Sequence, residues 1–247
     1  SKRVAFVTGG NGGIGSAVCR ELANRGNQVV AGIFPPEKEA AEAWQKELKE
    51  QGVEVALALV DVSDFADCER AAKEITDQFG SIDILVNCAG ITRDGTLKKM
   101  PEENWTAVMA TNLDSAFNVT RHVINGMLER GWGRIVNIAS VNGQRGQFGQ
   151  ANYSAAKAGM HGFTMAVALE TAAKGITVNT ISPGYISTAM TQAMPEEVLQ
   201  SIINSVPMRR MGEPEEIADA VAWLASEANA YTTGANIPVN GGLFTSH

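Results

Sequence analysis

A tyrosine and a lysine four positions apart are the residues best suited to acid–base chemistry. Tyr153 and Lys157 lie in a stretch with helical periodicity, so their side chains are expected on one helix face, about one turn apart. A free phenol has a pKa of about 10, too high for efficient proton transfer at neutral pH. A neighbouring ammonium stabilises the phenolate and is expected to lower that pKa. This spacing alone is more often a solvated helix face, so its meaning depends on the surrounding sequence.

Two further polar residues extend the group. Ser140 follows a short apolar run at residues 134–138, where its hydroxyl would hold and polarise a substrate carbonyl. Asn112 falls within a predicted helix, whose interior does not favour asparagine, so we expect it to have a local polar role such as holding a water next to Lys157. Ser140, Tyr153 and Lys157 together predict the reduction of a ketone to a secondary alcohol.

A glycine-rich turn at residues 8–15 joins the first predicted strand to the first predicted helix. Glycine permits positive φ angles and close approach of a ligand, and the helix N-terminus offers unpaired N–H groups to a pyrophosphate. Gly10, Gly12 and Gly15 fit the general dinucleotide pattern G-x-G-x-x-G, while Gly9, Gly13 and Gly15 fit the more informative T-G-x-x-x-G-I-G. A dinucleotide site is predicted, with a plain tight turn as the alternative.

Two more turns follow predicted strands, where such a sheet binds its ligand. Asp61 and Val62 come after the third strand, and the carboxylate of Asp61 is placed to accept from an adenine amino group. Its alternative role is to cap the next helix, which Ser63 or Asp64 would serve equally well. Residues 87–90 end the fourth strand with small side chains that leave room for a ribose.

Short β-branched runs alternate with longer amphipathic stretches along the chain. The predicted strands are residues 4–8, 29–33, 55–60, 84–87, 134–138, 177–181 and 235–239, and the predicted helices are residues 13–25, 37–51, 66–79, 102–130, 150–174 and 215–226. Apolar strands joined by helical crossovers predict a parallel sheet covered on both faces, and one α/β domain over residues 1–247. Residues 187–210 are expected to form a substrate lid or a surface helical hairpin.

Composition narrows the function classes. A net charge of −7 argues against nucleic acid as a partner, and no apolar run approaches the roughly 20 residues of a membrane helix. The three cysteines and three histidines show neither disulfide nor metal-ligand spacing, so no metal site is expected. The N-terminus leads directly into a strand without room for a signal peptide, which predicts a cytoplasmic protein.

These motifs resemble the short-chain dehydrogenase/reductase family over essentially the whole chain, including Pro183-Gly184 and the Asn-Gly-Gly at residues 240–242. The resemblance implies a single Rossmann-type, doubly wound domain with a seven-stranded parallel sheet, usually in a homotetramer. It assigns catalysis to Asn112, Ser140, Tyr153 and Lys157, with Tyr153 as the general acid and Lys157 also bound to the nicotinamide ribose.

The same resemblance supplies the cofactor-binding residues. They are Gly9, Asn11, Gly13, Ile14, Gly15, Asp61, Val62, Asn87, Ala89, Gly90, Tyr153, Lys157, Pro183, Gly184 and Ile186. Cys88 departs from the family, which commonly has a second asparagine there, and we expect little functional cost.

A narrower resemblance is to the acetoacetyl-CoA reductases of polyhydroxyalkanoate synthesis. It rests on residues 91–94, 131–138, 140–144, 146–150, 161–164 and 182–186. It implies reduction of acetoacetyl-CoA to (R)-3-hydroxybutyryl-CoA. Gln147, Phe148, Gln150 and Tyr185 are the predicted substrate contacts, as amide donors to the thioester and aromatic walls for the acyl chain. Ordinary loop packing is the alternative for the two aromatic residues.

Two rival functions remain at this point. A 3-oxoacyl-acyl-carrier-protein reductase shares the chemistry and needs a basic surface for its acidic partner, to which Lys98, Lys99, Arg121 and Arg130 would contribute. The phosphates of coenzyme A would use the same cations. A non-catalytic dinucleotide sensor would have no need to keep the serine, tyrosine and lysine together.

Cofactor choice depends on the segment after the second strand. An NADPH site needs cations for the 2′-phosphate, usually arginine, but no arginine occurs between positions 25 and 70. The acid that usually marks an NADH site is also missing, because Ile33 ends the strand. Glu37 and Glu39 follow and would repel a phosphate, while Lys38 offsets one of them. These residues predict a preference for NADH, with NADPH still usable.

Overall fold

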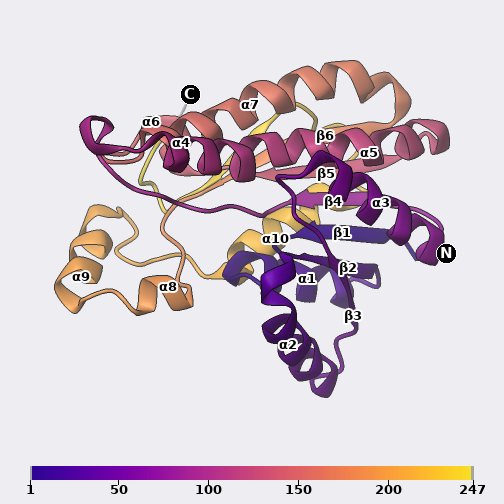
Figure 1. Cartoon of the computed structure of the whole chain (residues 1–247), viewed down its shortest axis with the longest axis horizontal. Helices are drawn as coiled ribbons and strands as arrows, with labels where there is room; N and C mark the ends of the chain where they lie inside the picture. The colour runs from indigo at the N-terminus through magenta and orange to yellow at the C-terminus, as the bar shows by residue number, and fades with distance from the viewer. Residues whose placement is uncertain (1, 246–247) are drawn as a thin grey trace.

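The computed structural model describes residues 2–245 and contains a seven-stranded parallel sheet (Figure 1). The strand order is β3-β2-β1-β4-β5-β6-β7. Successive strands are added on one side of β1 up to β3 and on its other side from β4 onward, so the strand order reverses between β1 and β4. The strands are β1 (Val4–Thr8), β2 (Gln28–Ile33), β3 (Val55–Leu59), β4 (Ile84–Asn87), β5 (Gly133–Ile138), β6 (Ile176–Pro183) and β7 (Asn236–Val239). This order confirms the predicted doubly wound α/β fold, which binds ligands where the order reverses.

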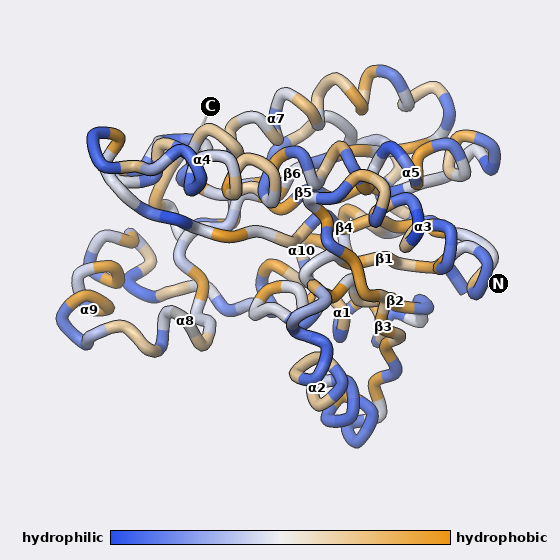
Figure 2. Tube along the Cα trace, in the orientation of Figure 1, coloured by the Kyte–Doolittle hydropathy of each residue, from blue (hydrophilic) through white to orange (hydrophobic). Residues whose placement is uncertain are grey.

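Helices cover both faces of the sheet (Figure 1). One face carries α1 (Gly13–Asn24), α2 (Lys38–Glu50) and α10 (Pro214–Ala225); the other carries α3 (Phe65–Phe79), α5 (Ser115–Arg130) and α7 (Ala151–Thr171). Successive strand residues pack into hydrophobic cores on opposite faces of the sheet: Ala5 and Val7 pack under α1 and α10, whereas Val4 and Phe6 pack under α3 and α5. Burial on both sides explains why β1, β2 and β3 are almost entirely apolar, whereas β5 and β6 also contain buried polar residues such as Asn137 and Asn179 (Figure 2).

The helix predicted over residues 102–130 is interrupted, contrary to expectation. It consists of α4 (Glu102–Met109), a π-helical turn η3 (Ala110–Asp114) and α5. Asn112 occupies this turn, and its Nδ2 donates to the carbonyl of Val108 at 2.9 Å. Wide turns of this kind are rare and occur often at functional sites. The sequence therefore singled out Asn112 as a polar residue with local contacts but did not predict the π-helical turn that contains it.

Short helices complete the chain. Three 3-10 turns are η1 (Pro35–Glu37), η2 (Leu97–Lys99) and η4 (Ala172–Lys174), and α6 (Val141–Arg145) fills a region predicted as loop. Residues 187–210 contain α8 (Ala189–Gln192) and α9 (Glu196–Ser205), which Figure 1 draws in orange apart from the sheet. No residue of α9 is buried. Among the residues that the structure describes, no helix has the length and apolar character needed to cross a bilayer.

Candidate active site

Ser140 and Tyr153, the predicted catalytic serine and tyrosine, come from neighbouring elements at the carboxyl edge of the sheet. Ser140 follows β5 and caps α6, where its Oγ accepts from the backbone N–H of Asn142 at 3.1 Å. Tyr153 lies in the first turn of α7. The hydroxyls of Ser140 and Tyr153 interact through a side-chain hydrogen bond that lowers the pKa of the phenol. The structure thus brings these two residues together, as their order in the sequence predicts.

Lys157 lies one turn further along α7 and is almost completely buried, with 4% of its surface exposed. Its Nζ donates to the carbonyl of Ile138 at 2.7 Å and lies 5.7 Å from the centroid of the Tyr153 ring. Burial lowers the pKa of Lys157 from 10.5 to about 8, because the charged form loses hydration. The neighbouring thiol of Cys88 opposes that shift.

The pKa of Tyr153 differs from the expectation that Lys157 lowers it. Burial raises the pKa of the phenol, and the hydrogen bond with Ser140 only partly opposes this. Lys157 Nζ donates to the carbonyl of Ile138 rather than to the phenol oxygen, and Lys157 is not among the groups that shift the pKa of Tyr153. The phenol therefore holds its proton at neutral pH, which is the state that a proton donor requires.

Asn112 is fully buried behind these residues. Its Nδ2 also donates to the carbonyl of Ile91 at 2.8 Å, whereas its Oδ1 has no partner. A Cβ placed on Gly90 would lie 2.5 Å from this Oδ1 and 3.6 Å from the Nζ of Lys157. The unpartnered oxygen and the ammonium therefore face the same small space, which suits a bridging water.

The glycine turn before α1 has the geometry of a pyrophosphate site. A Cβ on Gly15 would lie 2.1 Å from the carbonyl of Gly9, so the turn can close only on glycine. A Cβ on Gly13 would lie 2.7 Å from the methyl group of Thr188, which starts the segment leading to α8. Gly12 and Gly13 are exposed at the N-terminus of α1 beside Thr188, and a glycine turn that ends in a helix N-terminus fits the pyrophosphate of a dinucleotide. Ile14 packs partly against the core below.

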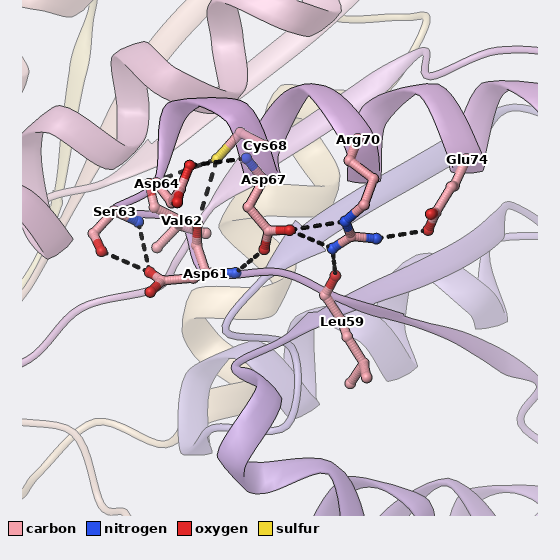
Figure 3. A network of polar contacts seen from close by, with 9 residues as sticks. All are labelled: Leu59, Asp61, Val62, Ser63, Asp64, Asp67, Cys68, Arg70 and Glu74. Atoms are coloured by element: carbon pink, nitrogen blue, oxygen red, sulfur yellow. Dashed lines mark hydrogen bonds and ion pairs between the residues drawn. The ribbon is translucent and has the colours of Figure 1, made fainter.

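The turn after β3 is held by a network of charged side chains (Figure 3). Asp64 caps α3 by accepting from the N–H of Asp67 at 3.0 Å, which leaves Asp61 free of that role. Arg70 pairs with Asp67, and the second oxygen of Asp67 accepts from the backbone N–H of Asp61 at 2.7 Å. The Oδ1 of Asp61 accepts from Ser63. Val62 is buried beneath the turn.

The side chain of Asn87 points into the core rather than toward the sheet edge. Its Nδ2 donates to Asn137 at 2.8 Å and to Thr120 at 3.3 Å, and its Oδ1 has no partner. Asn137 in turn donates to Thr164 of α7 at 2.9 Å. Only the backbone of Asn87 reaches the edge where a cofactor would bind.

Thr8 begins the T-G-x-x-x-G-I-G motif, and the structure shows what its hydroxyl does. Its Oγ1 accepts from the backbone N–H groups of Cys88 and Ala89 at 3.0 and 3.1 Å. This pair of bonds fixes the turn after β4 against the end of β1, beside the glycine turn. The motif places Thr8 next to the glycines, but nothing in the sequence predicts its bonds to a turn 80 residues away.

Pro183 ends β6 and starts the segment expected to flank the nicotinamide. The N–H of Gly184 donates to the carbonyl of Val239 at 2.9 Å, and a Cβ there would lie 2.8 Å from the Cα of Asn240. Ile186 is buried. Tyr185 lies in the wall of a cavity of about 360 Å³ between this segment and the residues that follow β7.

The amide of Gln150 is occupied within the chain. Its Oε1 accepts from the Nδ2 of Asn142 at 3.0 Å, and its Nε2 donates to both carboxylate oxygens of Asp94 at 3.1 Å. Because the N–H of Asn142 binds the Oγ of Ser140, Gln150 connects Asp94 to the catalytic serine. Asp94 lies in residues 91–94, one of the segments similar to the acetoacetyl-CoA reductases, but its sequence position does not predict the contact with Gln150.

The other two candidates on this loop, Gln147 and Phe148, are exposed. The ring of Phe148 is 87% exposed, so it does not pack against its own loop. Its side chain is available to a ligand at the surface beside Gln150.

Glu37, which follows β2 in η1, contacts the glycine turn through its carboxylate. The Nδ2 of Asn11 donates to Glu37 Oε2 at 3.0 Å, which holds that carboxylate over the turn. Lys38 is directed away, because its Nζ lies 3.7 Å from Glu42 on the next turn of α2. Lys38, which was expected to offset the charge of Glu37 or Glu39, is thus paired with Glu42 instead.

Comparison with known proteins identifies the family. A family model described as short chain dehydrogenase matches residues 3–199. The chain belongs to the short-chain dehydrogenase family. Its members are oxidoreductases that use a nicotinamide dinucleotide, and the glycine turn, the two strand-end turns and the serine, tyrosine and lysine described above are the parts of this chain that fit that chemistry.

Three relatives narrow the comparison within the short-chain dehydrogenases. An acetoacetyl-CoA reductase of Allochromatium vinosum is 63% identical over 242 residues, covering 98% of each chain. An acetoacetyl-CoA reductase of Cupriavidus necator is 52% identical over 243 residues, also covering 98% of each. A 3-oxoacyl-[acyl-carrier-protein] reductase of Vibrio cholerae is 46% identical over 242 residues, covering 98% of this chain and 97% of the relative.

Proposed function

We propose that this short-chain dehydrogenase reduces acetoacetyl-CoA to (R)-3-hydroxybutyryl-CoA. The observation that carries the proposal is the ranking of its relatives: 63% identity to an acetoacetyl-CoA reductase against 46% to a carrier-protein reductase, over equal lengths. The arrangement of Ser140, Tyr153 and Lys157 supports ketone reduction but does not distinguish the two thioesters.

In the proposed mechanism, Ser140 and Tyr153 hold the ketone oxygen between their hydroxyls. When bound, the reduced nicotinamide supplies the hydride that adds to the ketone carbon. Tyr153 gives its proton to the developing alkoxide, and preorganised donors at that oxygen stabilise the charge. Lys157 stabilises the resulting phenolate and holds the nicotinamide ribose, while Asn112 binds a water next to the ammonium of Lys157, from which the proton is replaced.

The cofactor residues are those expected from the family. The backbone of Gly9, Asn11, Gly13, Ile14 and Gly15 would hold the pyrophosphate, Asp61 and Val62 the adenine, Asn87, Ala89 and Gly90 the riboses, and Pro183, Gly184 and Ile186 the nicotinamide. NADH is the proposed preferred cofactor, since the carboxylate of Glu37 lies over the turn and Lys38 is paired with Glu42. NADPH remains usable.

The substrate contacts are Gln147, Phe148, Gln150 and Tyr185. Phe148 offers an exposed side chain, and Gln150 would exchange its hydrogen bond with Asp94 for one to the thioester. Residues 187–210 form the lid, consistent with the exposed surface of α9.

We further propose a homotetramer in the cytoplasm. Phe117 on α5 and both Met165 and Leu169 on α7 are at least half exposed, and exposed apolar side chains of this size mark protein interfaces. The cysteines are free thiols, which suits a reducing compartment. Light scattering of the purified protein measures the oligomer directly.

The test of function compares kcat/KM for acetoacetyl-CoA and for acetoacetyl-acyl-carrier protein, each with NADH and NADPH. The expected result is a higher value for the CoA thioester, formation of the (R) alcohol, and a higher value with NADH. A higher value for the carrier-linked substrate would replace the proposal with the carrier-protein reductase. Arg130 offers that rival little support, because it binds Asp83 and the carbonyl of Ile82, at the sheet edge opposite Ser140.

A further inference from the structure

Two exposed loops lie side by side at the mouth of the active site. The first is residues 92–99, between β4 and α4, and the second is residues 145–150, between α6 and α7. They are joined by a parallel bridge between Gly95 and Gln150, by a hydrogen bond from the N–H of Gly95 to the carbonyl of Gly149 at 2.8 Å, and by the Asp94–Gln150 contact. The second loop directly connects the helix capped by Ser140 to the helix that carries Tyr153. Figure 1 shows the first loop projecting beside α4 and α6.

This pair of loops, called the paired loops below, is basic in an acidic protein. Residues 92–99 and 145–150 contain four basic residues and one acid, whereas the whole chain has a net charge of −7. The acid is Asp94, whose carboxylate is bound to the amide of Gln150. The four cations are exposed, and within the described part of the chain none forms an ion pair: Arg93, Lys98, Lys99 and Arg145.

The nearest other acids do not cancel this charge. Glu102 and Glu103 lie in the first turn of α4, where the partial positive charge of the helix N-terminus offsets part of theirs. Two large apolar side chains complete the surface: Leu97 is 75% exposed and Phe148 is 87% exposed. Exposed apolar groups beside unpaired cations are the chemistry that binds an adenine ring together with its phosphates.

The segment after β6 lacks the excess positive charge of the paired loops. Between Ser187 and Met208 the only charged residues are Glu196 and Glu197, both in α9. They line a shallow groove with Gln200, Ser201 and Asn204. Arg209 and Arg210 follow, so residues 187–210 carry no net charge, and a polyphosphate is attracted more strongly to the paired loops.

We propose that the paired loops bind the 3′-phosphorylated adenosine diphosphate of coenzyme A, with Lys98, Lys99 and Arg145 on its phosphates and Leu97 against its adenine. The inference rests on the proposed acetoacetyl-CoA reduction and names the surface that distinguishes a full coenzyme A thioester from a truncated one. These side chains are not required for the chemistry at Ser140 and Tyr153.

The test uses two substrates that differ only in the nucleotide: acetoacetyl-CoA and acetoacetyl-pantetheine. The variant is Lys98→Gln combined with Lys99→Gln, and the matched control is Lys46→Gln combined with Lys49→Gln, two exposed lysines of α2. We expect KM for acetoacetyl-CoA to rise about tenfold in the variant, since exposed charge contacts contribute up to about a factor of five each. kcat and the values for acetoacetyl-pantetheine stay as in the parent, and the control matches the parent throughout.

Three results would overturn the inference: no change in KM for acetoacetyl-CoA, an equal change with acetoacetyl-pantetheine, or an equal change in the control. An effect confined to carrier-linked acetoacetate would assign the surface to an acidic protein instead. If the parent does not reduce acetoacetyl-CoA, the proposed function fails, and the surface is then tested by calorimetry of free coenzyme A with NAD+ present. Weaker binding to the variant than to the control supports the surface, and equal binding refutes it.

Discussion

Replacing Glu37 with glutamine tests how the protein chooses between NADH and NADPH. The hydrogen bond from Asn11 holds the carboxylate of Glu37 over the glycine turn, on the side where the adenosine ribose is expected. The 2′-phosphate of NADPH carries a charge of about −1.5 to −2 and is repelled by this carboxylate. Glutamine removes the charge but keeps an oxygen that accepts from Asn11, so the turn retains its shape.

The size of the effect follows from Coulomb's law. Two unit charges about 4 Å apart interact by about 1 kcal/mol in water and about 4 kcal/mol at an effective dielectric constant of 20. Glu37 is exposed, so the lower figure applies, and the nearly doubled phosphate charge brings the repulsion to about 1.5 kcal/mol. Glu37→Gln should therefore raise kcat/KM for NADPH roughly tenfold and change that for NADH by less than about threefold.

The assay measures kcat/KM for both dinucleotides at saturating acetoacetyl-CoA and fixed ionic strength. Glu50→Gln is the control, because this exposed acid at the far end of α2 changes the net charge equally. The gain with NADPH should shrink as salt is added, since screening weakens exposed interactions. An unchanged NADPH to NADH ratio in Glu37→Gln, or an equal change in Glu50→Gln, would refute the electrostatic reasoning.

Three further predictions concern the catalytic group. Tyr153→Phe should lower kcat by at least about a hundredfold while NADH binding, followed by fluorescence, stays near the parent value; substantial turnover would remove Tyr153 from the mechanism. Because the pKa of Lys157 is about 8, kcat/KM for NADH should fall as the pH rises through 8 and the ammonium loses its proton; a pH profile flat to pH 10 contradicts this role. Gln150→Glu places a carboxylate against Asp94 and should lower kcat/KM for acetoacetyl-CoA about tenfold, whereas adding Asp94→Asn should restore most of it. A double variant no better than Gln150→Glu would show that Asp94 does not act through residue 150.

The sequence predicted the features that depend on short-range patterns. The seven strands lie within a few residues of their predicted positions, because buried parallel strands are short runs rich in β-branched residues between longer amphipathic segments. Tyr153 and Lys157 share a helix for a similar reason, since their spacing belongs to one periodic segment. The pattern that failed was the helix over residues 102–130, where one irregular turn leaves the hydrophobic periodicity on either side intact.

Contacts between distant segments could not be predicted in the same way. Asp94 and Gln150 are 56 positions apart, and nothing in either neighbourhood shows that their loops meet. The direction of the pKa shift of Tyr153 was also missed, because spacing identifies Lys157 as a neighbour but does not reveal how deeply both side chains are buried.

The π-helical turn at Ala110–Asp114 accommodates one more residue than an α-helical turn would hold, because its hydrogen bonds join residues five rather than four apart. The extra residue is absorbed within the turn, so α4 and α5 keep nearly the phase of one continuous helix. Asn118, which donates to the carbonyl of Val62 at 3.0 Å, and Thr120, which accepts from Asn87, therefore still face the sheet. A single-residue deletion between Ala110 and Asp114 would consequently leave α5 folded in place and change only the local position of Asn112.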